Sequence, residues 1–443
     1  MLGTIIGKSI TKIERLFKFN ASSFPGKVVL KLFPEYLRKI KYPDNIIFVT
    51  GSSGKGSTVK LIKEILQNNN MKVCSNDEGS NLLFGAATAI VNSVKGKKLN
   101  ADALLLEVDE RYLKIITKHI KPKYLIINNI TRDQPPRQGS FDIVFNELLK
   151  GIHSNVHLIL NGDDPILRKF SLYYKGKITY YGLEKTKYSF KEMNDVKDYE
   201  YCPKCHNKLN YNYYHYGSVG DYKCPKCDFK RDNIEYSITK VDYKNNEITI
   251  NKDIKININN FILFNLYNII SSYTMSNIIG IDDNTIINTI NNSKINEKIF
   301  KEFTVNNRKY TILNCKAENN STYNLSLIYT AMDTEKKTIV LGLREISRRY
   351  KHFDLSWLYD IYFELLNTCN VDKIICAGPY AYDIATRIKY ADFDEKNIII
   401  LDDLTNIKET IDKETKGNIY AVLNFDYVEP FINKVKEEDV KWK

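Results

Sequence analysis

The sequence predicts an α/β protein in which two parallel-sheet domains follow one another along the chain. The first observation is a series of short apolar runs that end in polar residues, such as IIFVT at 46–50 and ALLLEVDE at 103–110. Continuous apolar runs of this length are typical of strands buried on both faces of a parallel sheet. The second observation is a glycine-rich turn, GSSGKGST at 51–58, directly after the first run. The third is a new series of apolar runs after residue 295.

The bulk composition indicates a globular protein without membrane spans. The chain has 443 residues, of which 43% are hydrophobic and 27% charged, and this length suits two or three domains. No apolar run approaches the roughly 18 residues of a membrane helix. The first stretch, MLGTIIGKSITKIERLF, has charged residues among its apolar ones and lacks the cleavage site of a signal peptide. We therefore expect a cytoplasmic protein.

The chain carries a formal charge of +12, from 65 lysines and arginines against 53 acids. Such a surplus suits contact with polyanions, among them nucleotides, nucleic acids and anionic membranes. The basic residues are spread along the whole sequence rather than gathered in a stripe, so we expect no nucleic-acid partner.

The apolar pattern divides the chain into three parts. Residues 1–40 are predicted to be a helical lead-in, residues 41–294 a nucleotide-binding domain, and residues 295–443 a C-terminal α/β domain. An insertion rich in Cys, Tyr, Lys and Asn interrupts the second part at 198–232. Ligands bind at the carboxyl ends of parallel strands. The segments predicted to converge on one crevice are therefore 50–58, 107–110, 128–133 and 161–164.

The glycine-rich turn carries the main functional signal. Its residues predicted to bind a nucleotide are Gly51, Ser53, Gly54, Lys55, Gly56, Ser57 and Thr58. Glycines let backbone N–H groups point inward, and the N-terminus of the following helix adds partial positive charge. Lys55 is predicted to reach the β- and γ-phosphates, and Ser57 or Thr58 to hold Mg²⁺ or a phosphate oxygen. A turn without a ligand is the alternative, but the strand before it and the helix after it favour phosphate binding.

An acidic strand end supplies a candidate magnesium ligand. Mg²⁺ needs a carboxylate and retains several waters. Glu107, in EVDE, is the candidate, although the same acids without the glycine-rich turn would be read as a solvated loop.

Four of the eight cysteines predict a metal site. Two CxxC pairs can turn four sulfurs onto one ion, and four thiolates leave no open position, so we expect a structural Zn²⁺. Its ligands are predicted to be Cys202, Cys205, Cys224 and Cys227. The nearby His206 and His215 are interpreted as surface residues.

Several motifs together resemble the Mur-ligase-like subunits of lipid II isoglutaminyl synthases, the MurT family. The resemblance covers residues 20–395 and includes GKGST, SNDEGSNLLFGAATAIV, EVDE, NNITRDQPPRQGS, LNGDDPIL, the CPKC…CPKC ribbon, FNLYNI, DLSWLYDIYFE and AGPYAYDIATRIKYA. The resemblance implies a Mur-ligase-type ATPase domain with an inserted ribbon and a Rossmann-like C-terminal domain.

The resemblance also implies a reaction. ATP activates the α-carboxylate of the D-glutamyl residue of lipid II as an acyl phosphate, and ammonia from a GatD-type glutaminase partner converts it to D-isoglutamine in peptidoglycan synthesis. Catalysis then depends on positioning and charge neutralisation by Lys55, Glu107 and Mg²⁺. The resemblance places Asn268 near the adenine. It also assigns to Asp354 the role of completing the Cys-His pair of the partner, with Asp360 as the fallback.

Two features leave alternatives open. The aspartate of DLSW also fits the N-cap of an amphipathic helix, with Trp357 packed inward. The stretches at 296–303 and 316–324 depart from the family's GRxE and KNPAG motifs, and lysine at 298 cannot copy an arginine fork. The alternatives are thus a ligase with another carboxylate acceptor, or a nucleotide-binding scaffold for a glutaminase. Lipid II lies in an anionic membrane, so peripheral contact with the inner face of the plasma membrane is a further hypothesis.

Overall fold

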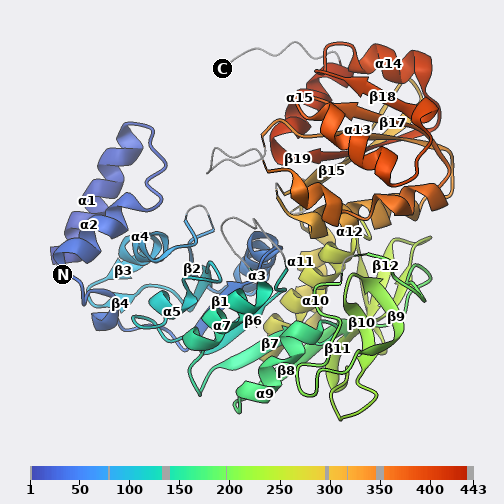
Figure 1. Cartoon of the computed structure of the whole chain (residues 1–443). Coiled ribbons are helices and arrows are strands. Elements are labelled where there is room, and N and C mark those ends of the chain that lie inside the picture. The colour runs from blue at the N-terminus through green and yellow to red at the C-terminus, as the bar shows by residue number, and fades with distance from the viewer. Residues whose placement is uncertain are drawn as a thin grey trace. The chain divides into compact units, whose positions relative to one another are not determined.

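A computed structural model describes residues 2–77, 80–131, 140–195, 197–294, 299–316, 318–345 and 354–436. Its contacts group the chain into two compact units (Figure 1). Unit 1 contains the described residues of 2–131, 140–191 and 199–294, and unit 2 those of 192–198 and 299–436. Both units are α/β, as the apolar runs predict.

Unit 1 begins with helices and continues into a nine-stranded sheet. Its helices are α1 (Leu2–Leu16), α2 (Phe24–Leu32), α3 (Lys55–Asn68), α4 (Leu83–Ser93), α5 (Leu113–Ile116), α7 (Phe141–Gly151), α8 (Pro165–Arg168), α9 (Phe170–Tyr173), α10 (Leu263–Ile278) and α11 (Asp283–Asn292). A 3₁₀ turn, Leu37–Lys39, precedes the sheet.

The strands of the large sheet lie in the order β13-β12-β11-β8-β7-β6-β1-β5-β2. They are β1 (Asn45–Thr50), β2 (Val73–Ser75), β5 (Ala103–Glu107), β6 (Tyr124–Ile127), β7 (His157–Asn161), β8 (Ile178–Leu183), β11 (Ile234–Asp242), β12 (Glu247–Ile250) and β13 (Ile254–Asn257). Pairing is parallel from β2 to β11 and antiparallel for β11-β12-β13. The small hairpin β3 (Val94–Lys95) and β4 (Lys98–Leu99) stands apart.

The central strands are apolar throughout because they are covered on both faces. Phe48, Leu106 and Leu125 join one core with residues of α4, α5 and α7. Helices α3 and α10 contact each other, and α10 also contacts β7, β8 and β11. The β1 strand lies at the centre of the parallel part, with β6 on one side and β5 on the other. Strand order changes direction at this point, and such switch points are where open α/β sheets bind ligands.

The Cys-rich insertion forms its own hairpin, β9 (Asn210–Tyr216) and β10 (Val219–Lys223). After the insertion, β11 and β12 are joined by a turn in which Asn246 has a φ of 53°. Asparagine suits this position because it tolerates the left-handed region.

Unit 2 has a six-stranded sheet in the order β14-β15-β19-β16-β17-β18, parallel except for the β14-β15 hairpin. Its strands are β14 (Phe300–Val305), β15 (Arg308–Cys315), β16 (Lys337–Gly342), β17 (Val371–Ala377), β18 (Ile398–Leu401) and β19 (Asn418–Asn424). Its helices are α12 (Asn320–Ala331), α13 (Ala381–Tyr390), α14 (Ile407–Glu414) and α15 (Phe425–Lys436), with 3₁₀ turns η3 (Ser356–Asp360), η4 (Phe363–Thr368) and η5 (Glu395–Asn397). The apolar runs predicted after residue 295 form strands of this sheet, among them YTILNC in β15 and IYAVLN in β19.

Candidate functional site

The glycine-rich turn connects β1 to α3 and adopts a conformation that requires glycine at two positions. Gly51 and Gly54 have φ values of 134° and 77°, a region that side chains rarely allow. Gly54 precedes the first residue of α3, so the backbone N–H groups of Lys55 and the following residues begin the helix. A side chain at Gly54 would also collide with the amide of Asn268. The turn therefore places a helix N-terminus, with its partial positive charge, at the carboxyl end of β1.

The end of β6 holds the other side of the turn. The carbonyl of Asn129 accepts from the Ser52 N–H at 3.1 Å. The side chain of Asn129 accepts from the Ser53 N–H at 2.9 Å and donates to the Ser53 carbonyl at 3.2 Å. These hydrogen bonds hold the shape of the turn in the absence of a ligand. Less conformational entropy is therefore lost when a ligand binds.

Lys55 lies at the start of α3 with its charge already neutralised. Its ammonium group donates to the buried carboxylate of Glu110 at 3.0 Å and to the carbonyl of Gly51. The Glu110 carboxylate is almost fully buried. These two contacts hold the Lys55 side chain over the turn in the absence of a ligand. A bound phosphate would compete with the Glu110 carboxylate for the ammonium group.

Glu107 ends β5 beside the first turn of α3. A side chain at Gly56 would lie 3.3 Å from Oε2 of Glu107. The other oxygen accepts from Asn81 at 3.3 Å, and the backbone N–H donates to Asn76 at 2.8 Å. The carboxylate thus lies next to the helix N-terminus, where it would offer an oxygen ligand to a magnesium ion bound together with a nucleotide.

The two candidate hydroxyls of the turn differ in accessibility. Thr58 is fully buried and links two amides, because Asn128 donates to its Oγ1 at 3.0 Å and Oγ1 donates to Asn268 at 3.3 Å. Ser57 is only half-buried. Ser57 is therefore the hydroxyl available to a metal ion, and Thr58 holds the turn to β6 and α10.

Two buried atoms beside Thr58 point to a polar ligand. Within the described part of the chain, Oδ1 of Asn128 and Nδ2 of Asn268 have no hydrogen-bond partner. Buried amide atoms are ordinarily paired, so each unpaired one has a cost that a ligand or water would remove. Nδ2 of Asn268 is a donor and suits a phosphate oxygen, whereas Oδ1 of Asn128 only accepts and requires a donor such as water. Together with Lys55 and the N-terminus of α3, the donors present fit a nucleotide phosphate. The placement of Asn268 near the adenine stays a prediction.

The predicted convergence of four segments on one crevice is only partly correct. The segments 50–58, 107–110 and the described residues of 128–131 meet at the turn, while 132–133 lie outside the described residues. Asp163, in the fourth segment, instead accepts from Arg231 at 2.7 Å, Tyr267 at 2.8 Å and the Leu183 N–H at 2.7 Å. This fully buried carboxylate ties the ribbon, α10 and β8 together, because a charge without solvent requires such partners.

The four predicted metal ligands do meet at one point. The sulfurs of Cys202, Cys205, Cys224 and Cys227 all lie within 4.8 Å of one another. The nearest pairs are 3.3 and 3.6 Å apart, much longer than a disulfide bond and close to the separation of two sulfurs on a tetrahedral Zn²⁺ with bonds of about 2.3 Å. In each CxxC pair a backbone N–H donates to the first sulfur: Lys204 donates to Cys202, and Lys226 donates to Cys224. The donor set suits a structural metal ion.

The interpretation of the two ribbon histidines as surface residues is correct for one and wrong for the other. His206 is exposed, but His215 is buried. Side chains alternate along β9, which turns His215 inward, where Nε2 contacts the Leu183 carbonyl at 3.0 Å and Nδ1 contacts Ser189 at 3.2 Å. Burial lowers the pKa of His215. It packs beneath the ribbon and takes no part in the cysteine cluster.

Asp354 lies two residues before the 3₁₀ turn η3 in unit 2, and Asp360 is the last residue of that turn. Asp354 is exposed and accepts from the Ser356 N–H at 2.8 Å, while Trp357 is buried. The inward tryptophan of the structural alternative is thus present. Its N-cap assignment is wrong, because Leu355 rather than Asp354 is the N-cap of η3, and the segment forms 3₁₀ turns rather than the predicted amphipathic helix.

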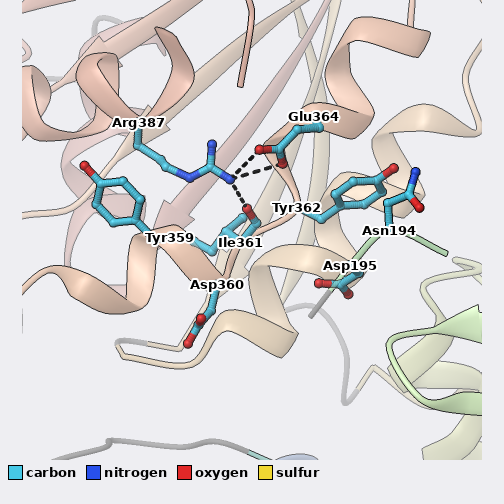
Figure 2. A pocket seen from close by; sticks show the side chains of 8 residues that line it. All are labelled: Asn194, Asp195, Tyr359, Asp360, Ile361, Tyr362, Glu364 and Arg387. Carbon is cyan, nitrogen blue, oxygen red and sulfur yellow. Dashed lines mark hydrogen bonds and ion pairs between the residues drawn. The ribbon is translucent and has the colours of Figure 1, made fainter. Parts of the chain in front are cut away.

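Asp360 lines a cavity of about 330 Å³ (Figure 2). The other residues that line the cavity are Asn194, Asp195, Tyr359, Ile361, Tyr362, Glu364 and Arg387. Arg387 donates to Glu364 at 2.8 Å and to the Ile361 carbonyl at 2.8 Å. Asp354 is therefore the more accessible of the two aspartates.

Comparisons with known proteins decide the family. A model of the Mur ligase middle domain matches residues 49–276, more than half of the chain. The chain belongs to the Mur ligase family. A second model, of the MurT ligase C-terminal domain, matches residues 317–427. These two matches cover the glycine-rich turn, the ribbon and the Asp354 segment of this Mur ligase family member.

Curated relatives extend the similarity over nearly the whole chain. One is 29% identical over 437 residues, covering 97% of this chain and 96% of its own, and is named lipid II isoglutaminyl synthase (glutamine-hydrolyzing) subunit MurT of Staphylococcus aureus. The subunit of the same name from Streptococcus pneumoniae is 26% identical, covering 96% of this chain and 94% of its own. The predicted resemblance to MurT is confirmed.

Solved structures confirm the fold. A pseudomurein peptide ligase type C from Methanothermus fervidus has a TM-score of 0.67 and 20% identity, covering 91% of this chain and 80% of that one. MurF ligase from Thermotoga maritima in complex with ADP has a TM-score of 0.59 and 18% identity, covering 94% and 84%. The predicted Mur-ligase-type α/β fold is therefore correct.

Sequence reasoning placed Asn128, Asn129 and Glu110 among the segments at the crevice but gave none of them an individual role. Asn128 and Asn129 follow β6, and Glu110 follows Glu107 by three positions. The strand ends locate these residues, but their contacts with Thr58, Ser53 and Lys55 are set by tertiary packing.

The cysteine cluster leads to a prediction about metal content and stability. We expect the purified protein to hold about one Zn²⁺ per chain and Cys205→Ser to lose it, because serine cannot supply a thiolate. The loss should lower the midpoint of thermal unfolding by several degrees, since metal binding contributes to folding. Elemental analysis and calorimetry measure both.

Cys369→Ser is the matched control, because Cys369 is a partly buried thiol outside the cluster. Zinc retained at full occupancy in Cys205→Ser, or equally lost in Cys369→Ser, contradicts the assignment.

Proposed function

We propose that this Mur ligase family member is the ATP-dependent subunit of a lipid II isoglutaminyl synthase. It would convert the α-carboxylate of the D-glutamyl residue of lipid II to an amide, in peptidoglycan synthesis. The observation that carries the proposal is the turn around Lys55, with Glu107 beside it, in a chain similar to MurT subunits over nearly its whole length.

The chemistry requires two displacements. The substrate carboxylate attacks the γ-phosphorus of ATP, and ADP leaves. Ammonia then attacks the acyl phosphate, and inorganic phosphate leaves. Lys55 and the N-terminus of α3 are positioned to bear the charge of the phosphates, and Glu107 and Ser57 to hold Mg²⁺, which neutralises the developing charge when bound. This chain then needs no nucleophile of its own.

The nitrogen in this proposal comes from a glutaminase of the GatD type, with which the chain forms a heterodimer. Asp354 is the residue that we assign to the partner's Cys-His pair, because it is exposed and lies within the part matched by the MurT C-terminal model. A carboxylate that accepts a hydrogen bond from a histidine fixes the tautomer of the imidazole and stabilises the charged imidazolium. Residues 41–294, with the ribbon at 198–232, are proposed as the ATP-binding domain and 295–443 as the domain that meets the glutaminase.

A second candidate function differs in the substrate carboxylate that is amidated. The stretch at 316–324 departs from the KNPAG motif, and part of 296–303, with lysine 298, lies outside the described residues. In the described part, Asn319 caps α12 by accepting from the Thr322 N–H at 2.9 Å. The second candidate is therefore a ligase of the same chemistry for a different carboxylate. The third, a scaffold that binds nucleotide without ligating, predicts ATP binding without turnover.

An ADP-release assay tests the proposal. The purified chain is given Mg-ATP and ammonium chloride, with or without a water-soluble lipid II analogue that carries D-glutamate. Ammonium replaces the glutaminase. We expect ADP formation to depend on the analogue and the product to be one mass unit lighter, as for carboxylate to amide conversion (about −1 Da).

The same assay discriminates the alternatives. ATP binding without ADP formation on any carboxylate supports the scaffold. ADP formation with another carboxylate but none with the analogue supports the second candidate. Either result contradicts the lipid II proposal.

A further inference from the structure

The first helix, α1, presents its apolar side to solvent. Its buried residues are small or hydroxylic, and they are Gly3, Thr4, Gly7 and Thr11. Four of its large apolar side chains are exposed, and they are Leu2, Ile5, Ile13 and Leu16. A helix on the surface of a globular domain ordinarily buries its apolar stripe and exposes its polar side. On α1 only Ile6 and Ile10 of the large apolar residues are half-buried, and the four named above are exposed together with Lys12 and Arg15.

Close packing fixes this orientation. A side chain at Gly7 would collide with Val91 of α4 and approach Val29 of α2 to 2.9 Å. The hydroxyls of Thr4 and Tyr36 are 2.8 Å apart. Lys8 donates to the Val94 carbonyl at 2.7 Å. Because only glycine allows this approach of α1 to α4 and α2, the helix cannot turn its apolar side inward without losing these contacts.

The loop after α1 continues the apolar surface. Leu16, Phe17 and Phe19 are 79%, 66% and 66% exposed, and Phe24, at the start of α2, is also exposed. The end of α1 and this loop extend beyond α4 (Figure 1). We call Leu2, Ile5, Ile13, Leu16, Phe17, Phe19 and Phe24 the hairpin patch. Several large apolar side chains exposed within one short segment are typical of an interaction site.

Basic residues surround the hairpin patch. Those that are exposed are Lys12, Arg15, Lys18, Lys27 and Lys31, and the stretch 2–32 has Glu14 as its one acid. Apolar and aromatic side chains on a helical surface with lysines and arginines beside them are typical of segments that lie in the interface of an anionic bilayer. In the described part of the chain, no helix meets the length and hydropathy of a membrane span.

We propose that the hairpin patch docks onto an anionic lipid surface. The apolar side chains enter the boundary between headgroups and acyl chains, and the surrounding lysines and arginines lie among the lipid phosphates. A second copy of this chain could also cover apolar side chains, but copies bearing the same positive charge repel each other, so the charge favours lipid. None of these residues belongs to the nucleotide site, so the proposal stands independently of the proposed reaction.

Flotation with vesicles tests the proposal on the full chain. We expect binding to vesicles of phosphatidylglycerol and phosphatidylcholine, little binding to phosphatidylcholine alone, and a decrease as salt rises. The variant Phe17→Ser/Phe19→Ser should partition about tenfold less, since it removes two apolar side chains from the interface. Arg15→Gln/Lys18→Gln should partition about tenfold less to anionic vesicles, because each basic side chain adds to the attraction.

The control variant is Tyr382→Ser/Tyr390→Ser, which removes two aromatic side chains that are 64% and 70% exposed in unit 2. It should bind as the unaltered chain does. All variants should unfold at the same temperature, because the side chains are exposed. They should also form ADP equally on a water-soluble substrate, which separates failure of docking from failure of the proposed reaction.

Two results would overturn the proposal. One is equal binding to vesicles with and without anionic lipid, or equal binding by the unaltered chain and by Phe17→Ser/Phe19→Ser. The other is a dimer in light scattering that this variant dissociates, together with no binding to anionic vesicles, which would assign the hairpin patch to self-association.

Discussion

Lys55→Ala is expected to lower the rate of ADP formation at least about 100-fold, because it removes the cation that the turn directs at the phosphates. Alanine retains helix propensity at the start of α3 and leaves both glycines in place. The substitution also removes the contacts of Lys55 with buried Glu110 and the Gly51 carbonyl, so the midpoint of thermal unfolding is measured as well, and an unchanged midpoint assigns the loss to the missing charge. Steady-state ADP formation with ammonium measures the rate, and calorimetric titration with ADP measures the affinity.

Lys63→Ala is the matched control for this prediction. Lys63 lies two turns further along the same helix and forms an ion pair with Asp77 at 3.0 Å. It loses the same charge without touching the turn, so its rate should stay within about twofold of the unaltered chain. If the rate of ADP formation fell equally in the two variants, the effect would arise from the overall positive charge of the protein. That result would contradict the specific role of Lys55.

Asp354→Asn is expected to lower glutamine-dependent ADP formation about 100-fold in the complex with the glutaminase, while ammonium-dependent formation stays unchanged. Asparagine keeps the oxygen that accepts from the Ser356 N–H, so η3 and the buried Trp357 should keep their places. It removes the negative charge that would stabilise a histidinium in the partner. The ratio of the two activities isolates that charge from folding and from ATP binding.

Asp360→Asn provides the comparison. Asp360 lines the cavity beside Arg387 and is less exposed than Asp354. If it alone loses the glutamine-dependent activity, the assignment moves to Asp360. If neither variant changes the ratio, or if Asp354→Asn loses both activities together, the proposed role in the partner's site is wrong.

The strands and the phosphate turn could be predicted from sequence because their signals are local. Apolar runs such as ALLLE have no solvated face, and Gly51 and Gly54 are required by the backbone of the turn itself. The cysteine pairs are equally local, since each CxxC forms its own knuckle.

The missed features depend on partners that are distant in sequence. Asp163 looked like a ligand-binding residue, but it contacts Arg231 and Tyr267, 68 and 104 positions away. His215 is buried because it packs against Leu183, at the end of β8. Thr58 is unavailable to a metal ion because it is buried against Asn268, 210 positions away in sequence. No periodicity in the sequence encodes such pairs, because they are set by tertiary packing.

Helix α10 joins two parts of unit 1 through consecutive residues. Tyr267 donates to the carboxylate that anchors the ribbon, and Asn268 lies against the phosphate turn. Adjacent residues of one helix therefore carry both contacts, and both lie in unit 1. A substitution that moves this part of α10 is expected to disturb the attachment of the ribbon and the packing of the glycine-rich turn together.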